Sequence, residues 1–234
     1  MTTVIVTAGG IGSRMNNSIP KQFININDKP LIVYTLEKFQ SHPSIDAICV
    51  TCLDGWQEIL KAYAKQYNIT KLKWVVTGGA TGQDSIHNGL MTVAKDASDD
   101  DLIMIHDGNR ALVSHDIISD SIRICKEKGS AVAAIPCTEA IFRCEDEENT
   151  YSTISIPRED VVRTQTPHTY PIKKLLWAHE QAEEKNITNT AASCVLMQML
   201  GETVYFSAGS EKNLKITTND DLQIFKALLN VEDK

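Results

Sequence analysis

The feature that most constrains the fold is a repeated alternation of short β-branched runs with longer stretches of helical periodicity. Patterns of buried strands occupy residues 3–7, 47–51, 74–77, 102–106 and 131–136. Helical patterns lie between them, at residues 30–39, 56–66, 84–93 and 116–126. Strands that alternate with helices in this way are joined by right-handed crossovers into a largely parallel sheet. The sequence therefore predicts an α/β fold with a mostly parallel sheet and helices on both of its faces.

This alternation changes after Pro136. Two short strand patterns, at residues 139–144 and 151–155, flank an acidic run at 145–148 that is typical of a solvated turn. We therefore expect a β-arm over residues 137–160, inserted into one domain that spans residues 1–234. The remaining patterns predict three helices and one more strand, at residues 172–184, 191–200, 220–229 and 203–207 respectively.

Composition and charge exclude several classes of protein. The 234 residues include 23 Lys and Arg against 30 Asp and Glu, and a formal charge of −7 is unsuited to general binding of nucleic acid. No apolar run approaches the roughly 20 residues that cross a bilayer. No basic region precedes the first apolar stretch, as it would in a signal peptide. We therefore predict a cytoplasmic protein with no nucleic-acid partner and no membrane partner.

The six cysteines predict free thiols, because they are scattered along a chain without an export signal. Cys49 and Cys52 form a Cys-x-x-Cys, but it falls within a predicted strand. Residues three apart in a strand point to opposite faces of the sheet, so this pair is not expected to bind zinc.

Glycines and cations follow the first predicted strand, where an open parallel sheet binds its ligands. The loop reads Ala8-Gly-Gly-Ile-Gly-Ser-Arg-Met15. It lacks the Gly-Lys-Ser/Thr of a Walker A loop, and Met15 replaces the third glycine of the dinucleotide fingerprint. Arg14 and Lys21 nevertheless place two cations near glycines whose backbone amides can approach a phosphate, which favours a polyphosphate ligand.

Polar residues follow the later strands in the same way. Gly78 and Gly79 end the third strand, and Asp84 and Ser85 are the predicted cap residues of the helix that follows. Asp107 comes directly after the fourth strand. A carboxylate beside a phosphate site suits Mg²⁺, a hard cation that prefers oxygen ligands.

Taken together, the motifs resemble the cytidylyltransferases that act on sugar-alcohol phosphates, over almost the whole chain. The loop from Ala8 to Met15 with Pro20-Lys-Gln-Phe23 is similar to the signature loop of that family. The later motifs arrive in the family's order: Gly78-Gly79 with Ser85 and Asn88-Gly-Leu90, Ile105-His-Asp107 with Arg110, Gln165-Thr-Pro167, and Asn213-Leu-Lys-Ile-Thr-Thr218. The resemblance implies a Rossmann-like nucleotidyltransferase fold.

The resemblance also implies a reaction and a site. CMP would pass from CTP to the phosphate of a sugar alcohol, giving a CDP-polyol and pyrophosphate, with Mg²⁺ as the cofactor. The implied residues are Ala8, Gly9, Gly10 and Gly12 for the CTP phosphates, Arg14, Lys21 and Lys215 for the α-phosphate, Gly79 and Ser85 for the cytosine, Asp107 for Mg²⁺, and Arg110, Arg158, Thr166 and Thr188 for the polyol phosphate. The β-arm would pair two copies into a homodimer, in which Arg158 and Thr166 hold the polyol phosphate across the interface.

Several positions depart from the family pattern, and the stretch from His106 to Ala111 replaces the usual small residue and Pro around Arg110. Gly82 stands where Arg is common, Ala140 where many methylerythritol enzymes have Thr, Asn189 where they have Asp, and Lys212 where the residue is often acidic. Most of these lie on the acceptor side, which weakens the methylerythritol assignment. The loop at 8–15 and residues 213–218 look closer to the branch that uses ribitol phosphate. D-ribitol 5-phosphate is therefore the expected acceptor, and 2-C-methyl-D-erythritol 4-phosphate is the alternative.

Two other classes of function stay open. Residues 7–12 resemble the opening turn of short-chain dehydrogenases, and Tyr67 and Lys71 have their Tyr-x-x-x-Lys spacing. That pair, however, lies far too early in the chain for an NAD(P)-dependent oxidoreductase. A nucleotide-binding module without catalysis would bind CTP and release no pyrophosphate.

Overall fold

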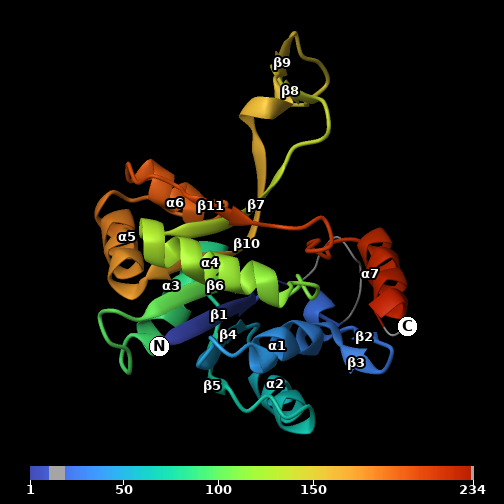
Figure 1. Ribbon diagram of the computed structural model, residues 1–234, viewed down its shortest axis with the longest axis vertical. Coiled ribbons are helices and arrows are strands. Elements are labelled where there is room, and N and C mark those ends of the chain that lie inside the picture. Colours follow the sequence, from blue (N-terminus) through green and yellow to red (C-terminus); the bar gives the residue numbers. More distant parts are fainter. Residues whose placement is uncertain (11–18, 233–234) are drawn as a thin grey trace.

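The computed structural model describes residues 1–10 and 19–232, and in it seven strands form one central sheet in the order β11-β7-β10-β6-β1-β4-β5 (Figure 1). The strands are β1 (Thr2–Ala8), β4 (Ala47–Cys52), β5 (Leu72–Thr77), β6 (Leu102–Asp107), β7 (Ala131–Pro136), β10 (Val162–Pro171) and β11 (Phe206–Ala208). The helices are α1 (Leu31–Ser41), α2 (Gln57–Gln66), α3 (Gly82–Val93), α4 (His115–Lys128), α5 (Ile172–Glu184), α6 (Ser193–Met199) and α7 (Asn219–Glu232). Within the described ranges, no helix combines the length and the apolar character needed to span a bilayer.

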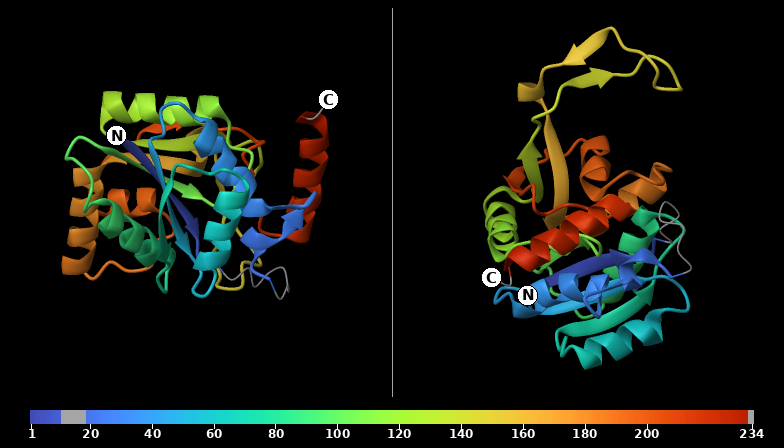
Figure 2. Two further views of the ribbon diagram at one scale, coloured as in Figure 1. Left: turned by 90° about the horizontal axis from the view of Figure 1, so that it is seen from below. Right: turned by 90° about the vertical axis from the view of Figure 1, so that its right-hand side faces the viewer.

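The two faces of the sheet are covered by different helices, as the sequence predicts (Figures 1 and 2). Val4 and Val6 of β1 pack with apolar residues of α1, α2 and α4, whereas Ile5 packs with α3, α5 and α6. This separation follows from the strand period of two, which sends alternate side chains to opposite faces. The same period places Cys49 and Cys52 in different cores, and both are free thiols.

One strand at the centre of the sheet, β10, is not among the predicted elements. It runs antiparallel between β6 and β7, and its pairing with β7 shifts register between Thr164 and His168. Pro167 interrupts this segment, and a proline argues against a central strand because it cannot donate to the ladder. The irregular pairing accommodates the proline, and the sheet is mostly parallel, as expected, rather than entirely so.

Two local predictions need correction. Thr81 caps helix α3, in place of Asp84 or Ser85: its hydroxyl accepts from Asp84 N at 3.1 Å while Asp84 Oδ2 accepts from Thr81 N at 3.0 Å. Asp84 thus acts as the third residue of a capping box. The last strand, expected at residues 203–207, is β11 at Phe206–Ala208, and it pairs in parallel with β7.

A β-arm projects from the body of the molecule, as predicted (Figures 1 and 2). Its strands β8 (Ile141–Arg143) and β9 (Ile154–Ile156) pair antiparallel as a separate two-stranded sheet. The short helix η3 (Arg158–Asp160) then leads into β10. The arm carries exposed aromatic side chains, Phe142 at 57% and Tyr151 at 59% exposure. Apart from the arm, a small hairpin of β2 (Asn25–Ile26) and β3 (Lys29–Pro30) precedes α1.

Candidate active site

The carboxyl ends of strands β1 and β6 form the centre of the site. Thr7 of β1 lies opposite Asp107 of β6 in the parallel register, and Gly108 N donates to Thr7 O at 2.9 Å. On the other side, Gly78 N donates to Cys52 O at 2.8 Å, which brings the loop after β5 to the same edge. This edge is where parallel α/β sheets bind their ligands.

A cavity of about 280 Å³ opens here, and we call it the glycine-side cavity because glycines from two loops line it. The described residues predicted for the nucleotide all lie on its wall: Ala8, Gly9, Gly10, Lys21, Gly79, Ser85 and Asp107. Lys215 also lines it. Gly12 and Arg14 fall outside the described residues. The structure therefore brings together backbone amides and two ammonium groups around one space, an arrangement that suits a phosphate chain.

The loop after β5, which also lines this cavity, is held by Ser85. Its Oγ accepts a hydrogen bond from Gly79 N at 3.0 Å and donates to Thr81 O at 2.9 Å. A Cβ atom on Gly79 would stand 2.2 Å from Asp84 Cβ, far inside van der Waals contact. Glycine is therefore required at position 79, because the helix start packs directly against the loop backbone.

A second cavity of about 290 Å³ adjoins the first, and we call it the β10-side cavity because residues of β10 form one wall. Its lining includes Gln83, Arg110, Thr166, His168 and Thr190. Four residues line both cavities: Thr7, Gly82, Asp107 and Lys215. A ligand in one cavity can therefore meet a ligand in the other beside Asp107 and Lys215.

Asp107 is the charged centre between the cavities. Its Oδ2 accepts from Arg110 Nε at 3.0 Å, and its Oδ1 lies 3.1 Å from Lys215 Nζ. Burial by itself would raise the pKa of Asp107, but Lys215 and then Arg110 hold that pKa at about 2. The carboxylate is thus ionised at neutral pH. Arg110 is the more buried of its two partners, with an 11% exposed side chain against 46% for Lys215.

Thr166 is held by two partners at the wall of the β10-side cavity. Its Oγ1 accepts from Asp107 N at 3.0 Å and lies 3.1 Å from His106 Nδ1. Nε2 of His106 lies 3.1 Å from the carbonyl oxygen of Arg110, which only accepts, so this nitrogen carries the ring proton. Burial lowers the pKa of His106 to about 4, and the imidazole is neutral. His106 therefore orients Thr166 and is not a cation of the site.

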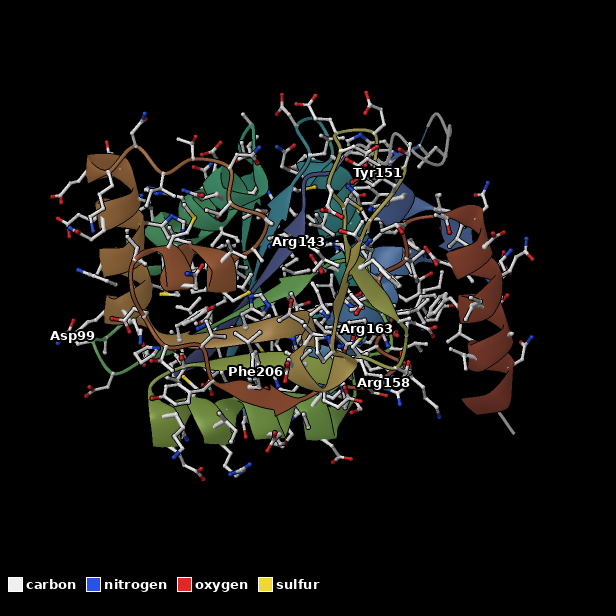
Figure 3. All side chains as sticks on the ribbon, turned by 90° about the horizontal axis from the view of Figure 1, so that it is seen from above. Asp99, Arg143, Tyr151, Arg158, Arg163 and Phe206 are labelled. Carbon is white, nitrogen blue, oxygen red and sulfur yellow. The ribbon has the colours of Figure 1, made fainter. Side chains whose placement is uncertain are left out.

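Two of the residues predicted for the polyol phosphate lie away from both cavities. Arg158 is exposed on the arm, where it pairs with Glu159 at 3.2 Å (Figure 3). Thr188 is also exposed and lines a neighbouring hollow beside Asn186 and Ile187. In that loop it is Thr190 that faces the β10-side cavity.

Three amide side chains that the sequence analysis did not single out also shape the site. Gln22, buried beside Lys21, donates from Nε2 to the carbonyl oxygen of Ala8. Asn213 is fully buried, and its Nδ2 donates to Thr166 O at 2.8 Å. The side chain of Gln83, on α3, bonds Ile187 and Thr190 in the loop before α6. Gln22 and Asn213 adjoin the cation motifs in the sequence, so their position was a usable signal, but their partners are set only by the tertiary contacts.

The donor set can be tested for a metal. Asp107 is the carboxylate that the two cavities share, and no other Asp or Glu lines either of them in the described part of the chain. Within that part, no group of three or more His, Cys, Asp or Glu side chains is arranged to hold a metal ion. One carboxylate together with substrate phosphates is, however, a usual environment for Mg²⁺. The residues therefore fit an ion that is bound jointly with a nucleotide.

Comparison with known proteins agrees with this geometry. The sequence model of the family described as "IspD: 2-C-methyl-D-erythritol 4-phosphate cytidylyltransferase" matches residues 2–231. The chain is 44% identical over 231 residues to a ribitol-5-phosphate cytidylyltransferase of Lacticaseibacillus paracasei, covering 98% of each chain. It is 37% identical over 227 residues to a 2-C-methyl-D-erythritol 4-phosphate cytidylyltransferase of Clostridium botulinum, covering 97% of this chain and 96% of that one.

A solved structure shares the whole fold. The 4-diphosphocytidyl-2C-methyl-D-erythritol synthase of Anaerococcus prevotii superposes with a TM-score of 0.81 over 98% of each chain, at 22% identity. The two chains thus share one fold. The chain belongs to the IspD family of cytidylyltransferases and is an enzyme of that class. The resemblance found in the sequence motifs is thereby confirmed, and a dehydrogenase is excluded.

Proposed function

We propose that the enzyme transfers CMP from CTP to D-ribitol 5-phosphate and releases pyrophosphate. The main support for this proposal is the pair of cavities that meet at Asp107 and Lys215. One has the glycine-lined wall that suits a triphosphate, and the other has hydroxyl, amide and guanidinium groups that suit a polyol phosphate. The ribitol acceptor is favoured by the identity of 44% to the Lacticaseibacillus enzyme, against 37% to the Clostridium enzyme.

The reaction needs positioning and charge neutralisation more than acid–base chemistry. An oxygen of the ribitol phosphate attacks the α-phosphorus of CTP, and the bond from that phosphorus to the bridging oxygen of pyrophosphate breaks. The nucleophile is already an anion, so no general base is required. This agrees with the weak basicity of His106, whose pKa is lowered to about 4 by burial.

The main obstacle is the repulsion between two phosphate anions. At 4 Å two unit charges repel by about 4 kcal/mol with an effective dielectric constant of about 20. Lys21 on the glycine side and Lys215 between the cavities offset this repulsion. Arg110 adds the positive charge of a guanidinium whose Nε and Nη1 are held by Asp107 and by the carbonyl oxygen of Asn213. We assign the same role to Arg14, which lies outside the described residues.

We further propose that Asp107 holds Mg²⁺ together with the CTP phosphates. The bound ion would withdraw charge from the α-phosphate and the leaving pyrophosphate. Lys215 and Arg110 hold the carboxylate ionised, and so keep it ready as an oxygen ligand.

We propose that the enzyme is a homodimer. Each copy is one nucleotidyltransferase domain of residues 1–234, and its arm, residues 137–160, contacts the other copy. The arm places Arg158 and two exposed aromatic residues, Phe142 and Tyr151, beyond the body of its own chain. An exposed two-stranded arm of this kind is an edge that a second copy can cover. Arg158 would then act on the partner's acceptor site.

The test is to incubate the enzyme with CTP and Mg²⁺, adding either D-ribitol 5-phosphate or 2-C-methyl-D-erythritol 4-phosphate, and to measure pyrophosphate. We expect release with ribitol 5-phosphate at a kcat/KM at least tenfold above that with the other acceptor. Release with the methylerythritol substrate alone would overturn the acceptor assignment. CTP binding without release from any polyol phosphate would point to a binding module.

A further inference from the structure

Gln83 joins the two halves of the site although it lies at the start of a helix. It is the second residue of α3, directly after the loop that lines the glycine-side cavity, and its own side chain lines the β10-side cavity. Nε2 of Gln83 donates to Ile187 O at 2.8 Å. Its Oε1 accepts from Thr190 N at 3.0 Å and from Thr190 Oγ1 at 2.9 Å. One amide therefore makes three hydrogen bonds to a segment more than 100 residues away.

The segment that Gln83 holds has little support of its own. Residues 186–192 connect α5 to α6 without regular secondary structure, and Ala192, the N-cap of α6, provides no side-chain cap. Ile187 N bonds back to the end of α5, at Ala182 O. Thr190, further along, has its backbone N–H and its hydroxyl directed to Gln83. Because Thr190 lines the β10-side cavity, the position of that wall depends on this contact.

The start of α3, from which Gln83 projects, is held by several hydrogen bonds of its own. Thr81 and Asp84 form the capping box of α3, and Ser85 bonds both Gly79 N and Thr81 O. The loop of the glycine-side cavity and the first turn of α3 are thus one hydrogen-bonded unit. Gln83 projects from that unit to the opposite wall.

We propose that Gln83 is a positioning residue for the acceptor, acting through Thr190; the inference rests on the proposed function, in which the β10-side cavity takes the ribitol phosphate. Gln83 fixes the Thr190 wall relative to the nucleotide loop, so that the acceptor meets a cavity already formed. Loss of the amide lets residues 186–192 move, and the acceptor must then order them when it binds. The nucleotide loop keeps its own capping box and its affinity for CTP.

The kinetic test compares Gln83→Ala, Thr190→Val and the double variant with Gln181→Ala as the matched control. Gln181 lies on α5, where its Nε2 donates to Glu184. We expect Gln83→Ala to raise the KM for ribitol 5-phosphate about tenfold, the value of one or two net hydrogen bonds, with the CTP KM unchanged within twofold. Thr190→Val should raise the acceptor KM about threefold and Thr190→Ser should restore it. The double variant should match Gln83→Ala alone.

Three results would overturn the proposal: an acceptor KM for Gln83→Ala within twofold of the parent, an equal rise in both KM values, or additive effects in the double variant. If Gln83→Ala fails to fold, Thr190→Val and Thr190→Ser decide by the same criterion. Hydrogen exchange gives a readout that needs no substrate: Gln83→Ala should speed exchange in peptides covering residues 186–192 at least tenfold and leave residues 79–85 unchanged. Unchanged exchange at 186–192 would contradict the inference, whereas failure of the parent enzyme with every acceptor would contradict only the proposed function.

Discussion

The two cavities of the site are built in contrasting ways. Half of the residues that line the glycine-side cavity belong to two short continuous segments, residues 8–10 and 79–82, that offer backbone amides and carry little side-chain bulk. The β10-side cavity is lined by side chains from α3, β6, β10 and the loop before α6, which are distant in sequence. The difference separates two tasks. A phosphate chain is recognised by backbone geometry, whereas an acceptor is chosen by side chains that packing must bring together.

The same contrast predicts which changes affect chemistry and which affect the choice of acceptor. Removing a cation from the glycine side should lower turnover for every acceptor. Changes confined to the β10 side should alter the acceptor KM and spare the nucleotide. Residues on both walls, Asp107 above all, should affect both.

The largest expected effect is that of Lys21→Ala. Loss of one ammonium group beside the triphosphate should lower kcat about 10³-fold, the upper range for one charge-stabilising group at a transition state. Steady-state release of pyrophosphate measures it, with Lys61→Ala as the control, since Lys61 is exposed on α2 and pairs with Glu58 at 2.7 Å. If a folded Lys21→Ala protein loses less than tenfold in turnover, Lys21 does not stabilise the charge of the reacting phosphates.

Asp107→Asn should have the next largest effect, a fall in kcat of about 10²-fold with a higher Mg²⁺ concentration needed for half-maximal rate. The substitution removes the proposed metal ligand and leaves Arg110 and Lys215 without the carboxylate between them. A Mg²⁺ titration of activity checks it against Asp54→Asn, whose carboxylate bonds Gln57 in the turn after β4. If Asp107→Asn needs the same Mg²⁺ concentration for half-maximal rate, Asp107 is not a ligand of the metal ion.

A pH-dependent effect should arise on the β10 side, from His179. Burial, and then the neighbouring His87, lower the pKa of His179 to about 4 from its ordinary value of 6.5. The unfolded chain therefore takes up this proton first, so stability is complete above pH 6.5 and is lost as the pH falls towards 4. Between pH 7 and 5 this one group should remove about 2 kcal/mol of unfolding free energy. Urea unfolding at both pH values measures it.

The control for this prediction is the folded variant His179→Gln, in which the loss of stability between pH 7 and 5 should be smaller by that amount. An equal loss in the variant and the parent would show that other groups carry the acid sensitivity.

The smallest effect is expected at Gly82, which lines both cavities. A Cβ atom there would meet no neighbour within 4 Å. Gly82→Ala should therefore leave the Kd for CTP within twofold, and Gly82→Arg should lower that Kd a few-fold by adding a cation to the glycine side. Isothermal titration with CTP checks both. Weaker CTP binding by Gly82→Arg would mean that this position faces the acceptor instead.

The sequence predicted most of the fold because its signals were local and periodic. Helix α5 and strand β7 have the predicted bounds, Ile172–Glu184 and Ala131–Pro136, and the other predicted strands and helices are present with bounds that moved by a few residues. In the central sheet the exception is β10, whose Pro167 masks a strand that pairs with β6 and β7. The capping box of Thr81 was equally local, and Asp84 three residues later was the signal that could have revealed it.

Site residues that belong to short sequence motifs were predicted, whereas a residue placed by distant contacts was not. Ala8, Gly9, Gly10 and Gly79 belong to short motifs and do lie together on one wall. Thr190 had no such signal. Its backbone N–H and hydroxyl bond Gln83, 107 positions earlier, and it lines the β10-side cavity, which Thr188 does not.

By itself, the sequence determined the alternating α/β order, the two-sided core and the glycine loop at the end of β1, because strand period, helix period and backbone freedom are properties of neighbouring residues. Tertiary structure alone decided the pairing of β10 with β6, the pairing of Asp107 with Lys215 and the hydrogen bonds of Gln83 to Thr190. These contacts join residues some 60 to more than 100 positions apart, and their energy exists only once packing has offset the entropy of bringing such distant segments together.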